Sequence, residues 1–354
     1  MLRTRFDWRL IVPALLLSAL GLLVIRSAAP ALFLNQFVFW LAAVVIFLIV
    51  SFVDFRVFTS LYIPIYVFSL AFLVTPFLFG LHSRGAQRWL QFGQSTLQPS
   101  EIIKPLLIIV FAVIAGSAYR RKTLLLAASA ILPLAVIFFQ PDLGTMLVLF
   151  IGWLTIFLSR VRLRVFLPAL LAFILLLLPI YKFVLRDYQR QRLESFLNPY
   201  SDPLGQGYHV IQSLIAVGSG EFFGRGLGHG TQSQLQFLPE HHTDFIFASL
   251  SEELGFVGAG LVLIFFLVLL YRIYRISQTT SSPVASAFCL STMALLAFQI
   301  FVNVGMNMGL APITGITLPF ISYGGSSLIS IGLTLGLVHS ISRTIHSEQY
   351  LQIS

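Results

Sequence analysis

Long apolar runs constrain this chain more than any other feature of its sequence. A helix of about 20 consecutive apolar residues crosses the hydrocarbon core of a bilayer. Runs of this kind cover residues 10–25, 34–53, 58–81, 102–118, 123–139, 143–159, 165–184, 245–271, 283–309 and 324–341. We therefore predict an all-α, polytopic membrane protein with about ten transmembrane helices. It forms a single integral membrane domain over residues 1–354, with a long outer loop, about 185–243, between spans 7 and 8.

The composition agrees with this class of protein. Hydrophobic residues make up 57% of the chain and charged residues only 10%, whereas a soluble domain has about 25% charged residues. The net charge of +9 comes mostly from basic residues in short loops between the apolar runs, so we expect no nucleic-acid partner. The one cysteine, Cys289, lies inside an apolar run, which excludes a disulfide framework within the chain.

Lysine and arginine in the short loops predict the orientation, because short basic loops stay on the cytoplasmic side. With the N-terminus inside, the short outer loops hold only Arg26, Arg84 and Arg88. The inner segments hold Arg3, Arg5, Arg9, Arg56, Arg120, Arg121, Lys122, Arg160, Arg162, Arg164, Arg272, Arg275 and Arg343. We therefore predict that both termini are cytoplasmic.

Three acidic residues stand at the starts of predicted spans, and ionisable groups at membrane depth mark functional sites by default. Glu101, Asp142 and Asp244 open the fourth, sixth and eighth spans, all of which run from outside to inside. Lys104 lies three residues after Glu101, on the same helix face, where it could pair with any of the three acids and first of all with Glu101 and Asp142. We interpret the three acids and this lysine as parts of one polar cavity at the outer boundary.

A simpler interpretation exists for each acid taken alone. A carboxylate in the first turn of a helix complements the helix dipole, and Ser100 and Thr243 have the side chains of N-caps. Three such acids on one side, together with a buried lysine, favour the shared cavity.

Glycine-rich segments flank the last of these acids. Residues 218–231 contain Arg225 and superficially resemble a phosphate-binding loop, but no strand precedes them, so a flexible loop is the favoured interpretation. Before them, residues 208–217 have the pattern of a short helix along the membrane surface. Residues 303–327 mix Pro and Gly with apolar residues, which is typical of irregular segments that line a cavity. A loop packed for structural reasons is an equal alternative there.

Short motifs in a fixed order cover most of the chain. They are residues 85–89 (GAQRW), 98–101 (QPSE), 140–145 (QPDLGT), 230–247 (GTQSQLQFLPEHHTDFIF), 251–255 (SEELG) and 318–326 (LPFISYGGS). Together they resemble the SEDS family of bacterial shape, elongation, division and sporulation proteins. Residues 303–306 (NVGM) and 312–315 (PITG) are more similar to the elongation members, typified by RodA, than to the division members, typified by FtsW.

The resemblance implies a ten-span peptidoglycan glycosyltransferase in the bacterial cytoplasmic (inner) membrane. Such an enzyme polymerises lipid II into glycan strands on the outer face of the membrane during cell elongation. The resemblance also implies partners: a class B penicillin-binding protein, which is a transpeptidase, and other membrane proteins of the elongation complex. It implies that Asp244 is the essential catalytic carboxylate.

The chemistry suits these residue types. The donor carries an undecaprenyl pyrophosphate leaving group, and the acceptor hydroxyl needs a base, for which Asp244 is the candidate. The pyrophosphate needs cations, either Lys104, Arg88 or Arg225, or a divalent ion such as Mg²⁺ or Mn²⁺ held by the acids. Further candidates for supporting or substrate-binding roles are Glu101, Asp142, Glu240, Thr243, Ser322 and Tyr323, with His242 or Glu240 as alternatives for sharing the proton.

Two other functions are open at this point. A flippase for the same lipid-linked sugar also has intramembrane charges and broken helices, and a scaffold would only activate the penicillin-binding protein. The acids cluster at the outer boundary, whereas a flippase needs polar groups along a path through the midplane. The placement of charge therefore favours the enzyme over the flippase.

Overall fold

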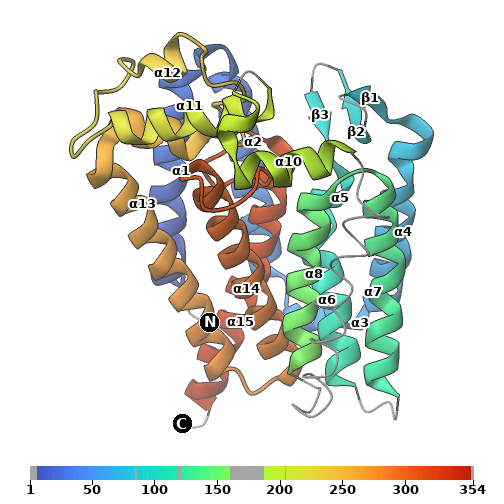
Figure 1. The fold of residues 1–354 in the computed structure, drawn as a ribbon. Helices are drawn as coiled ribbons and strands as arrows, with labels where there is room; N and C mark the ends of the chain where they lie inside the picture. The colour runs from blue at the N-terminus through green and yellow to red at the C-terminus, as the bar shows by residue number, and fades with distance from the viewer. Residues whose placement is uncertain are drawn as a thin grey trace.

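The chain folds into a bundle of long helices (Figure 1). The structure is a computed structural model and describes residues 6–83, 86–93, 95–117, 121–159, 187–203 and 205–351. The long helices are α1 (Trp8–Ala28), α2 (Pro30–Phe52), α4 (Tyr62–Phe79), α6 (Lys104–Gly116), α7 (Lys122–Phe139), α8 (Leu143–Leu158), α13 (Ile246–Thr279), α14 (Pro283–Asn307) and α15 (Gly325–Leu351). Shorter helical pieces are α3 (Phe55–Ser60), α5 (Pro99–Ile102), α10 (Asp187–Leu197), the 3₁₀ turn η2 (Pro199–Ser201), α11 (Gln206–Ser219) and α12 (Thr231–Gln234).

The predicted spans match the long helices. Seven of the described helices are long and apolar enough to cross a membrane, and α6 and α8 are shorter apolar helices. Together they account for nine of the ten predicted spans. The predicted seventh span, 165–184, lies outside the described residues. The prediction of a polytopic helical membrane protein is confirmed.

Helix α15 lies in the interior of the bundle and packs along α2. Small residues allow this close approach, as is usual where membrane helices pack. A side chain at Gly332 would collide with the main chain of Ala43, and one at Gly336 would lie 2.9 Å from Val50. As a result α15 is 72% buried over its apolar stretch, whereas α2 is 17% buried and presents most of its surface outward.

A buried ion pair joins three elements at the end of the bundle that carries both termini (Figure 1). Asp7, just before α1, accepts hydrogen bonds from Arg272 of α13 at 2.9 and 3.1 Å. Its carboxylate also accepts a 2.7 Å bond from Ser342 of α15. These contacts fix the start of the chain against the ends of two later helices.

The opposite end of the bundle carries a small antiparallel sheet, a feature that the all-α prediction missed. Strands β1 (Leu81–Ser83), β2 (Ala86–Phe92) and β3 (Ser95–Leu97) pair in the order β1-β2-β3. Gly93 supplies the positive φ of +61° in the turn between β2 and β3, which glycine adopts without steric cost. Strands β1 and β3 have only three residues each, and the seven residues of β2, AQRWLQF, do not alternate regularly between apolar and polar, so the sequence pattern did not predict them. Figure 1 shows the sheet at the same end as α11 and α12.

The glycine-rich segment is packed on α13, although the sequence favoured a flexible loop. The main-chain N–H groups of Arg225 and Gly226 donate to the carbonyl oxygens of Glu252 and Glu253 at 2.9 and 3.0 Å. Helix α13 has a kink at Gly255 (φ +66°) beside this loop. The predicted short helix over 208–217 is confirmed as α11, which crosses the end of the bundle (Figure 1).

Candidate functional site

A buried ion pair lies at the junction between α5 and α6. The ammonium of Lys104 donates to both carboxylate oxygens of Glu101 at 2.8 Å. The helix is interrupted at Ile103, and Pro105 follows in the first turn of α6, but the two side chains still meet across the break. The predicted pairing of Lys104 with Glu101 is therefore confirmed.

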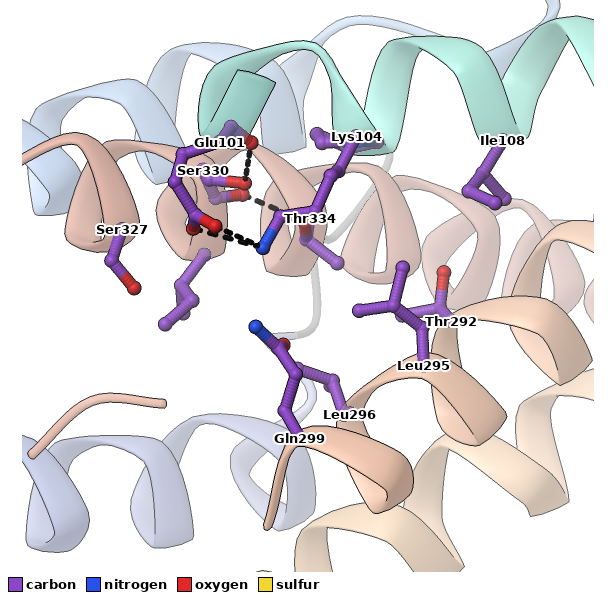
Figure 2. A pocket seen from close by; sticks show the side chains of 12 residues that line it. Glu101, Lys104, Ile108, Thr292, Leu295, Leu296, Gln299, Ser327, Ser330 and Thr334 are labelled. Atoms are coloured by element: carbon purple, nitrogen blue, oxygen red, sulfur yellow. Dashed lines mark hydrogen bonds and ion pairs between the residues drawn. The ribbon is translucent and has the colours of Figure 1, made fainter. Parts of the chain in front are cut away.

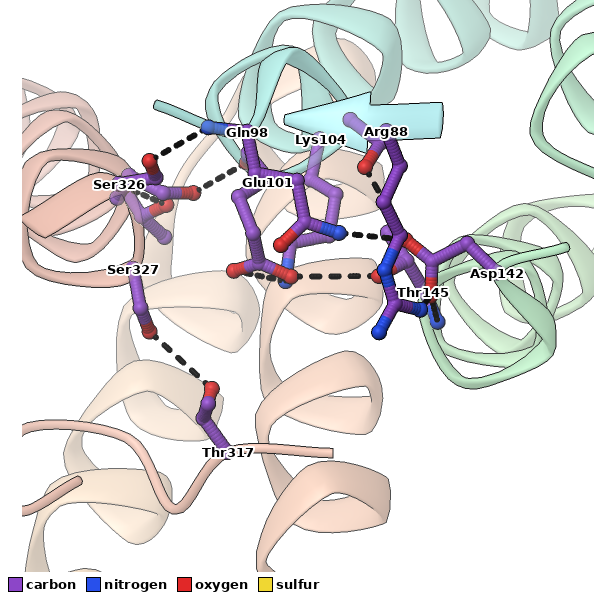
Figure 3. Close-up of polar contacts among 12 residues, drawn as sticks. Arg88, Gln98, Glu101, Lys104, Asp142, Thr145, Thr317, Ser326 and Ser327 are labelled. Carbon is purple, nitrogen blue, oxygen red and sulfur yellow. Dashed lines mark hydrogen bonds and ion pairs between the residues drawn. The ribbon is translucent and has the colours of Figure 1, made fainter. Parts of the chain in front are cut away.

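The second predicted acid, Asp142, has a different cation as its partner. Its carboxylate lies 3.3 Å from the guanidinium of Arg88 on β2 and also accepts from Gln98 and Ser100. It caps α8 by accepting the N–H of Thr145 at 3.3 Å. Both partners of the ion pair come from elements far apart in sequence (Figure 3). The sequence suggested Lys104 for this acid as well, and the structure gives Arg88 this position.

Thr145 joins the two ion pairs into one polar cluster. Its hydroxyl lies 3.5 Å from Oε1 of Glu101, while its N–H is bound by Asp142. The cluster thus contains two carboxylates and two cationic side chains, all at least partly buried (Figure 3). Charges buried in this way are stable only when they are paired and hydrogen-bonded.

A cavity of about 20 Å³ lies beneath the Glu101–Lys104 pair, large enough for about one water molecule. Its polar lining comes mainly from α14 and α15, with Thr292 and Gln299 on one side and Ser330 and Thr334 on the other. Figure 2 shows Gln299 on the far side of the cavity from the ion pair. The polar side chains below the cluster therefore enclose a space of about one water molecule.

Asp244 lies in the loop before α13, and the segment that follows α14 holds the main chain of this loop. The carbonyl oxygen of His242 accepts the N–H of Tyr323 at 2.9 Å. The next carbonyl, that of Thr243, accepts the hydroxyl of Ser322 at 2.7 Å. Ser322 and Tyr323 therefore lie beside the predicted catalytic residue, and Asp244 itself is partly exposed. The irregular segment predicted over 303–327 is confirmed from Met308 to Gly324.

The helix-end interpretation is correct for two of the acids but not for the two hydroxyl residues. Glu101 lies in the first turn of α5 and Asp142 is the N-cap of α8. Ser100 lies inside α5, and its hydroxyl donates to Asp142. Thr243 lies three residues before α13 and donates to the carboxylate of Glu240 at 3.1 Å. Capping by Ser100 and Thr243 is therefore wrong, because each hydroxyl is used by a neighbouring acid.

One segment, residues 314–327, connects Asp244 with the polar cluster. A side-chain carbon at Gly315 would lie 3.6 Å from Oδ2 of Asp244. Further along, Thr317 and Ser327 form a 3.3 Å hydrogen bond, and the hydroxyl of Ser326 accepts the N–H of Gln98 at 2.8 Å (Figure 3). The predicted single polar region therefore consists of two parts with this segment between them.

Arg225 is held in the glycine-rich loop. Its guanidinium donates to the carbonyl of Ser219 at 3.2 Å and to the hydroxyl of Thr231 at 3.3 Å. These contacts explain the residue structurally as part of the loop that packs on α13. Its predicted role as a phosphate contact stays a prediction.

Among the described residues no three His, Cys, Asp or Glu side chains form a group that could hold a metal ion. Glu101 and Asp142, the acids that the sequence suggested as ligands, have Lys104 and Arg88 as their partners. The residues described here do not provide a ready ligand set for Mg²⁺ or Mn²⁺. We therefore derive no catalytic step through a divalent cation, which stays a prediction from sequence.

Sequence reasoning missed the residues that position the site. Gln98 and Thr145 bind the acids, and Asn303 and Asn307 bind the Asp244 loop. The signal for the two asparagines was present, since they are amides four residues apart near the end of an apolar run. Nothing in the chain order indicated which loop they contact.

Comparison with known proteins identifies the family. Residues 8–347 match the family model of FtsW, RodA and SpoVE, described as "Cell cycle protein". The chain belongs to the FtsW/RodA/SpoVE family. The resemblance to the SEDS family, drawn from the motifs, is thereby confirmed.

Relatives with assigned names cover most of the chain. The "Peptidoglycan glycosyltransferase MrdB" of Escherichia coli K12 is 42% identical over 284 residues, which are 78% of this chain and 76% of that protein. "Stage V sporulation protein E" of Bacillus subtilis is 36% identical over 368 residues, with coverage of 96% and 98%. Similarity to this family therefore extends along nearly the whole chain.

Solved structures of the family share the fold. A chain from a structure described as "Structural coordination of polymerization and crosslinking by a peptidoglycan synthase complex" superposes with a TM-score of 0.83 at 32% identity, covering 96% of this chain and 98% of that one. The rod shape determining protein RodA of Thermus thermophilus gives a TM-score of 0.72 at 27% identity, with coverage of 96% and 98%.

Proposed function

We propose that the protein is a peptidoglycan glycosyltransferase that polymerises lipid II at the outer face of the bacterial cytoplasmic membrane during cell elongation. The observation that carries the proposal is the presentation of Asp244. A partly exposed carboxylate stands on a loop whose main chain is held at successive residues, next to a segment that leads to Lys104 and Arg88. The names of relatives, such as the E. coli glycosyltransferase, support the same activity.

In the proposed reaction the hydroxyl oxygen of the acceptor sugar attacks the anomeric carbon of the donor. Asp244 accepts the hydroxyl proton as the new glycosidic bond forms. The bond from the anomeric carbon to the pyrophosphate oxygen breaks, and undecaprenyl pyrophosphate leaves with its electron pair. General-base catalysis of this kind typically contributes about 10²–10⁴-fold to the rate.

The two cationic side chains of the cluster, Lys104 and Arg88, are suited to different roles in this reaction. The side chain of Arg88 is 32% exposed while that of Lys104 is 4% exposed. Arg88 contacts Asp142 through Nη1, and its guanidinium carries further N–H donors that can bind an incoming pyrophosphate. Lys104 is too deeply buried for direct contact and would act through its charge on the neighbouring groups.

Glu240 and His242 are proposed as supporting residues of the base. Glu240 accepts from Thr243 at 3.1 Å, and the ring of His242 lies 5.7 Å from that of Tyr323. Both flank the loop that carries Asp244. We propose that one of them shares the proton that Asp244 takes from the acceptor hydroxyl. Mutation of Glu240 or His242 alone, with Asp244 intact, tests this role separately.

We also propose that the protein works with a class B penicillin-binding protein, together with the other membrane proteins of the elongation complex. The solved structure that superposes with a TM-score of 0.83 is described as a peptidoglycan synthase complex that coordinates polymerization and crosslinking. Both termini would be cytoplasmic, as the basic loops predict, and the active site would face outward. The position of both termini at the end of the bundle opposite the sheet supports this orientation (Figure 1).

The cavity below the cluster favours polymerisation over transport. A flippase must pass a disaccharide-pyrophosphate through the middle of the membrane, whereas this cavity has room for about one water molecule. The polar groups of Thr292 and Gln299, which lie below the cluster, line this small space.

The test is polymerisation in detergent, where flipping has no meaning. Purified protein with its partner is incubated with labelled lipid II, and glycan chains are separated by length. Wild type is expected to make chains, and Asp244→Asn to lose about 10²–10⁴-fold of the rate. Asp54→Asn is the matched control, since Asp54 is an exposed N-cap of α3.

Two outcomes would contradict the proposal. Chains made by Asp244→Asn at the wild-type rate would exclude Asp244 as the base. No chains from wild type, with or without the partner, would favour transport or a scaffold.

A further inference from the structure

Two buried asparagines of α14 converge on one main-chain atom of the candidate base. The side-chain amides of Asn303 and Asn307 donate to the carbonyl oxygen of Asp244 at 3.0 and 3.1 Å. Both asparagines are fully buried. They lie four residues apart and therefore on the same face of the helix. A buried amide destabilises the fold unless it is hydrogen-bonded. Both amides meet this requirement in part through the same acceptor, the carbonyl oxygen of Asp244.

Asn307 also binds the first turn of α13. Its Oδ1 accepts the N–H of Ala248 at 3.0 Å, while its Nδ2 donates to Asp244 and to the carbonyl of Asn303 at 2.7 Å. Donors face one side of the amide and acceptors the other, which fixes its orientation. Helix α13 has no side-chain cap from its own N-cap residue. Asn307 thus caps α13 from the neighbouring helix α14. The N–H group that it binds belongs to Ala248, two residues after the first residue of α13 and four residues after Asp244.

Asn303 binds the other wall of the site. Besides Asp244, its Nδ2 donates to the carbonyl of Ile316 at 2.7 Å. The residue before Ile316 is Gly315, whose φ is +71° and whose added side-chain carbon would lie 3.6 Å from Oδ2 of Asp244. One amide therefore sets both the loop that carries the carboxylate and the segment that faces it.

We propose that Asn303 and Asn307 are positioning residues that hold the main chain of Asp244, so that its carboxylate keeps its place relative to the segment at Gly315. The proposal rests on the catalytic role proposed above for Asp244. A displacement of about 1 Å in a reacting group can cost about 10²-fold in rate. The asparagines therefore contribute to turnover without contacting the substrate.

The test replaces each amide by the isosteric carboxylate. In Asn303→Asp and Asn307→Asp an acceptor oxygen faces the carbonyl of Asp244, and the donors are lost. We expect kcat for lipid II polymerisation, measured per folded protein, to fall about 10–100-fold. KM for lipid II is expected to change less than about 3-fold, because uniform substrate binding is retained. Asn303→Ser and Asn307→Ser, which are neutral and too short to reach, give the same result if the carboxylate variants do not fold.

Ser291→Ala is the matched control on the same helix. Ser291 is fully buried and donates a 2.7 Å hydrogen bond to the carbonyl of Gly152, so its loss destabilises the bundle without touching the Asp244 loop. We expect this variant to unfold at a lower temperature in detergent while it keeps its kcat.

Wild-type kcat in the folded asparagine variants would overturn the proposal. So would an equal loss of kcat in Ser291→Ala, because the effect would then be general loosening of the bundle. Failure of the proposed function itself is distinguishable, since in that case the wild type makes no glycan chains at all.

Discussion

The two parts of the candidate site are held in opposite ways. Around Glu101 and Asp142 the carboxylates themselves are bound, by Lys104 and Arg88 and by the side chains of Gln98, Ser100 and Thr145. In the loop that carries Asp244, the main chain is bound through three successive carbonyl oxygens, those of His242, Thr243 and Asp244. The first arrangement pairs the charges of Glu101 and Asp142, and the second fixes the path of the main chain.

The difference teaches which contribution each part can make to catalysis. When a buried carboxylate loses its cation partner, the fold is destabilised, because an uncompensated charge is left in the interior. The hydrogen bonds that hold the Asp244 loop end on main-chain carbonyl oxygens, so these bonds do not depend on the protonation state of the carboxylate. The cluster is thus suited to electrostatic support, and Asp244 to proton transfer.

The largest effect is expected when the ion pair between Glu101 and Lys104 is broken. Lys104→Met leaves the Glu101 carboxylate buried without its cation, which costs about 3–5 kcal/mol of stability. The double variant Glu101→Gln/Lys104→Met removes both charges and is expected to recover most of that loss. Unfolding in detergent, followed with temperature, measures all three proteins. A double variant no more stable than the single one would show that the pair is more than an ion pair.

The next effect addresses position at Asp244. Asp244→Glu keeps the carboxylate but moves it by about one bond length, which should cost about 10²-fold in polymerisation rate. The unfolding temperature is measured beside the rate, and the main-chain hydrogen bonds of the loop are expected to be kept. A fully active Asp244→Glu enzyme would mean that position matters less than charge, and the contrast between the two regions would not stand.

A third prediction concerns an acid that organises a loop. The fully buried carboxylate of Glu252 accepts hydrogen bonds from Thr231, Gln232 and Ser233, two of them from main-chain N–H groups. Glu252→Gln places an amide donor against these donors and should cost about 1–3 kcal/mol. Faster proteolysis of the 220–235 loop measures the change.

Glu253→Gln serves as the comparison for this prediction. Oε1 of Glu253 accepts from Ser27 and Gly228, and glutamine keeps one such oxygen. Its loop should be cleaved at nearly the wild-type rate. Equal cleavage of the two variants would show that negative charge on α13, rather than hydrogen-bond geometry, holds the loop.

The smallest effect lies at the far end of the bundle. Burial raises the pKa of Asp7, but hydrogen bonds from Arg272 and Ser342 and the charge of Arg272 outweigh burial, so the pKa is below its ordinary value. A carboxyl whose pKa is lowered by folding adds stability above its unfolded pKa of about 3.9, and this is lost as pH falls through the folded value.

Asp7→Asn should therefore lower stability by about 1–2 kcal/mol at pH 7, less than the loss of Lys104, because asparagine keeps one acceptor oxygen and the side chain of Arg272 is 20% exposed. The difference from wild type should persist down to about pH 5 and shrink below about pH 4. Melting curves across this range measure it. A difference that grows on acidification would mean that the Asp7–Arg272 pair does not stabilise the fold.

The sequence predicted the membrane class and nine of the helices that the structure describes, because hydrophobic length alone decides whether a helix spans a membrane. It also identified Glu101, Lys104, Asp142 and Asp244 as exceptional, because charge in an apolar run needs an explanation. The sheet at 81–97 escaped it, since three short strands carry too little periodicity.

Partnership between distant residues was outside the reach of the sequence. Whether Asp142 meets Lys104 or Arg88 depends on how β2, α5 and α8 converge, and chain order does not fix that geometry. The asparagines of α14 were visible as polar residues in an apolar helix, but only packing placed them against Asp244. Composition thus determined that this chain lies in a membrane and carries unusual charges, while the tertiary structure decided which cation pairs with Glu101 and Asp142 and which side chains hold the main chain of the Asp244 loop.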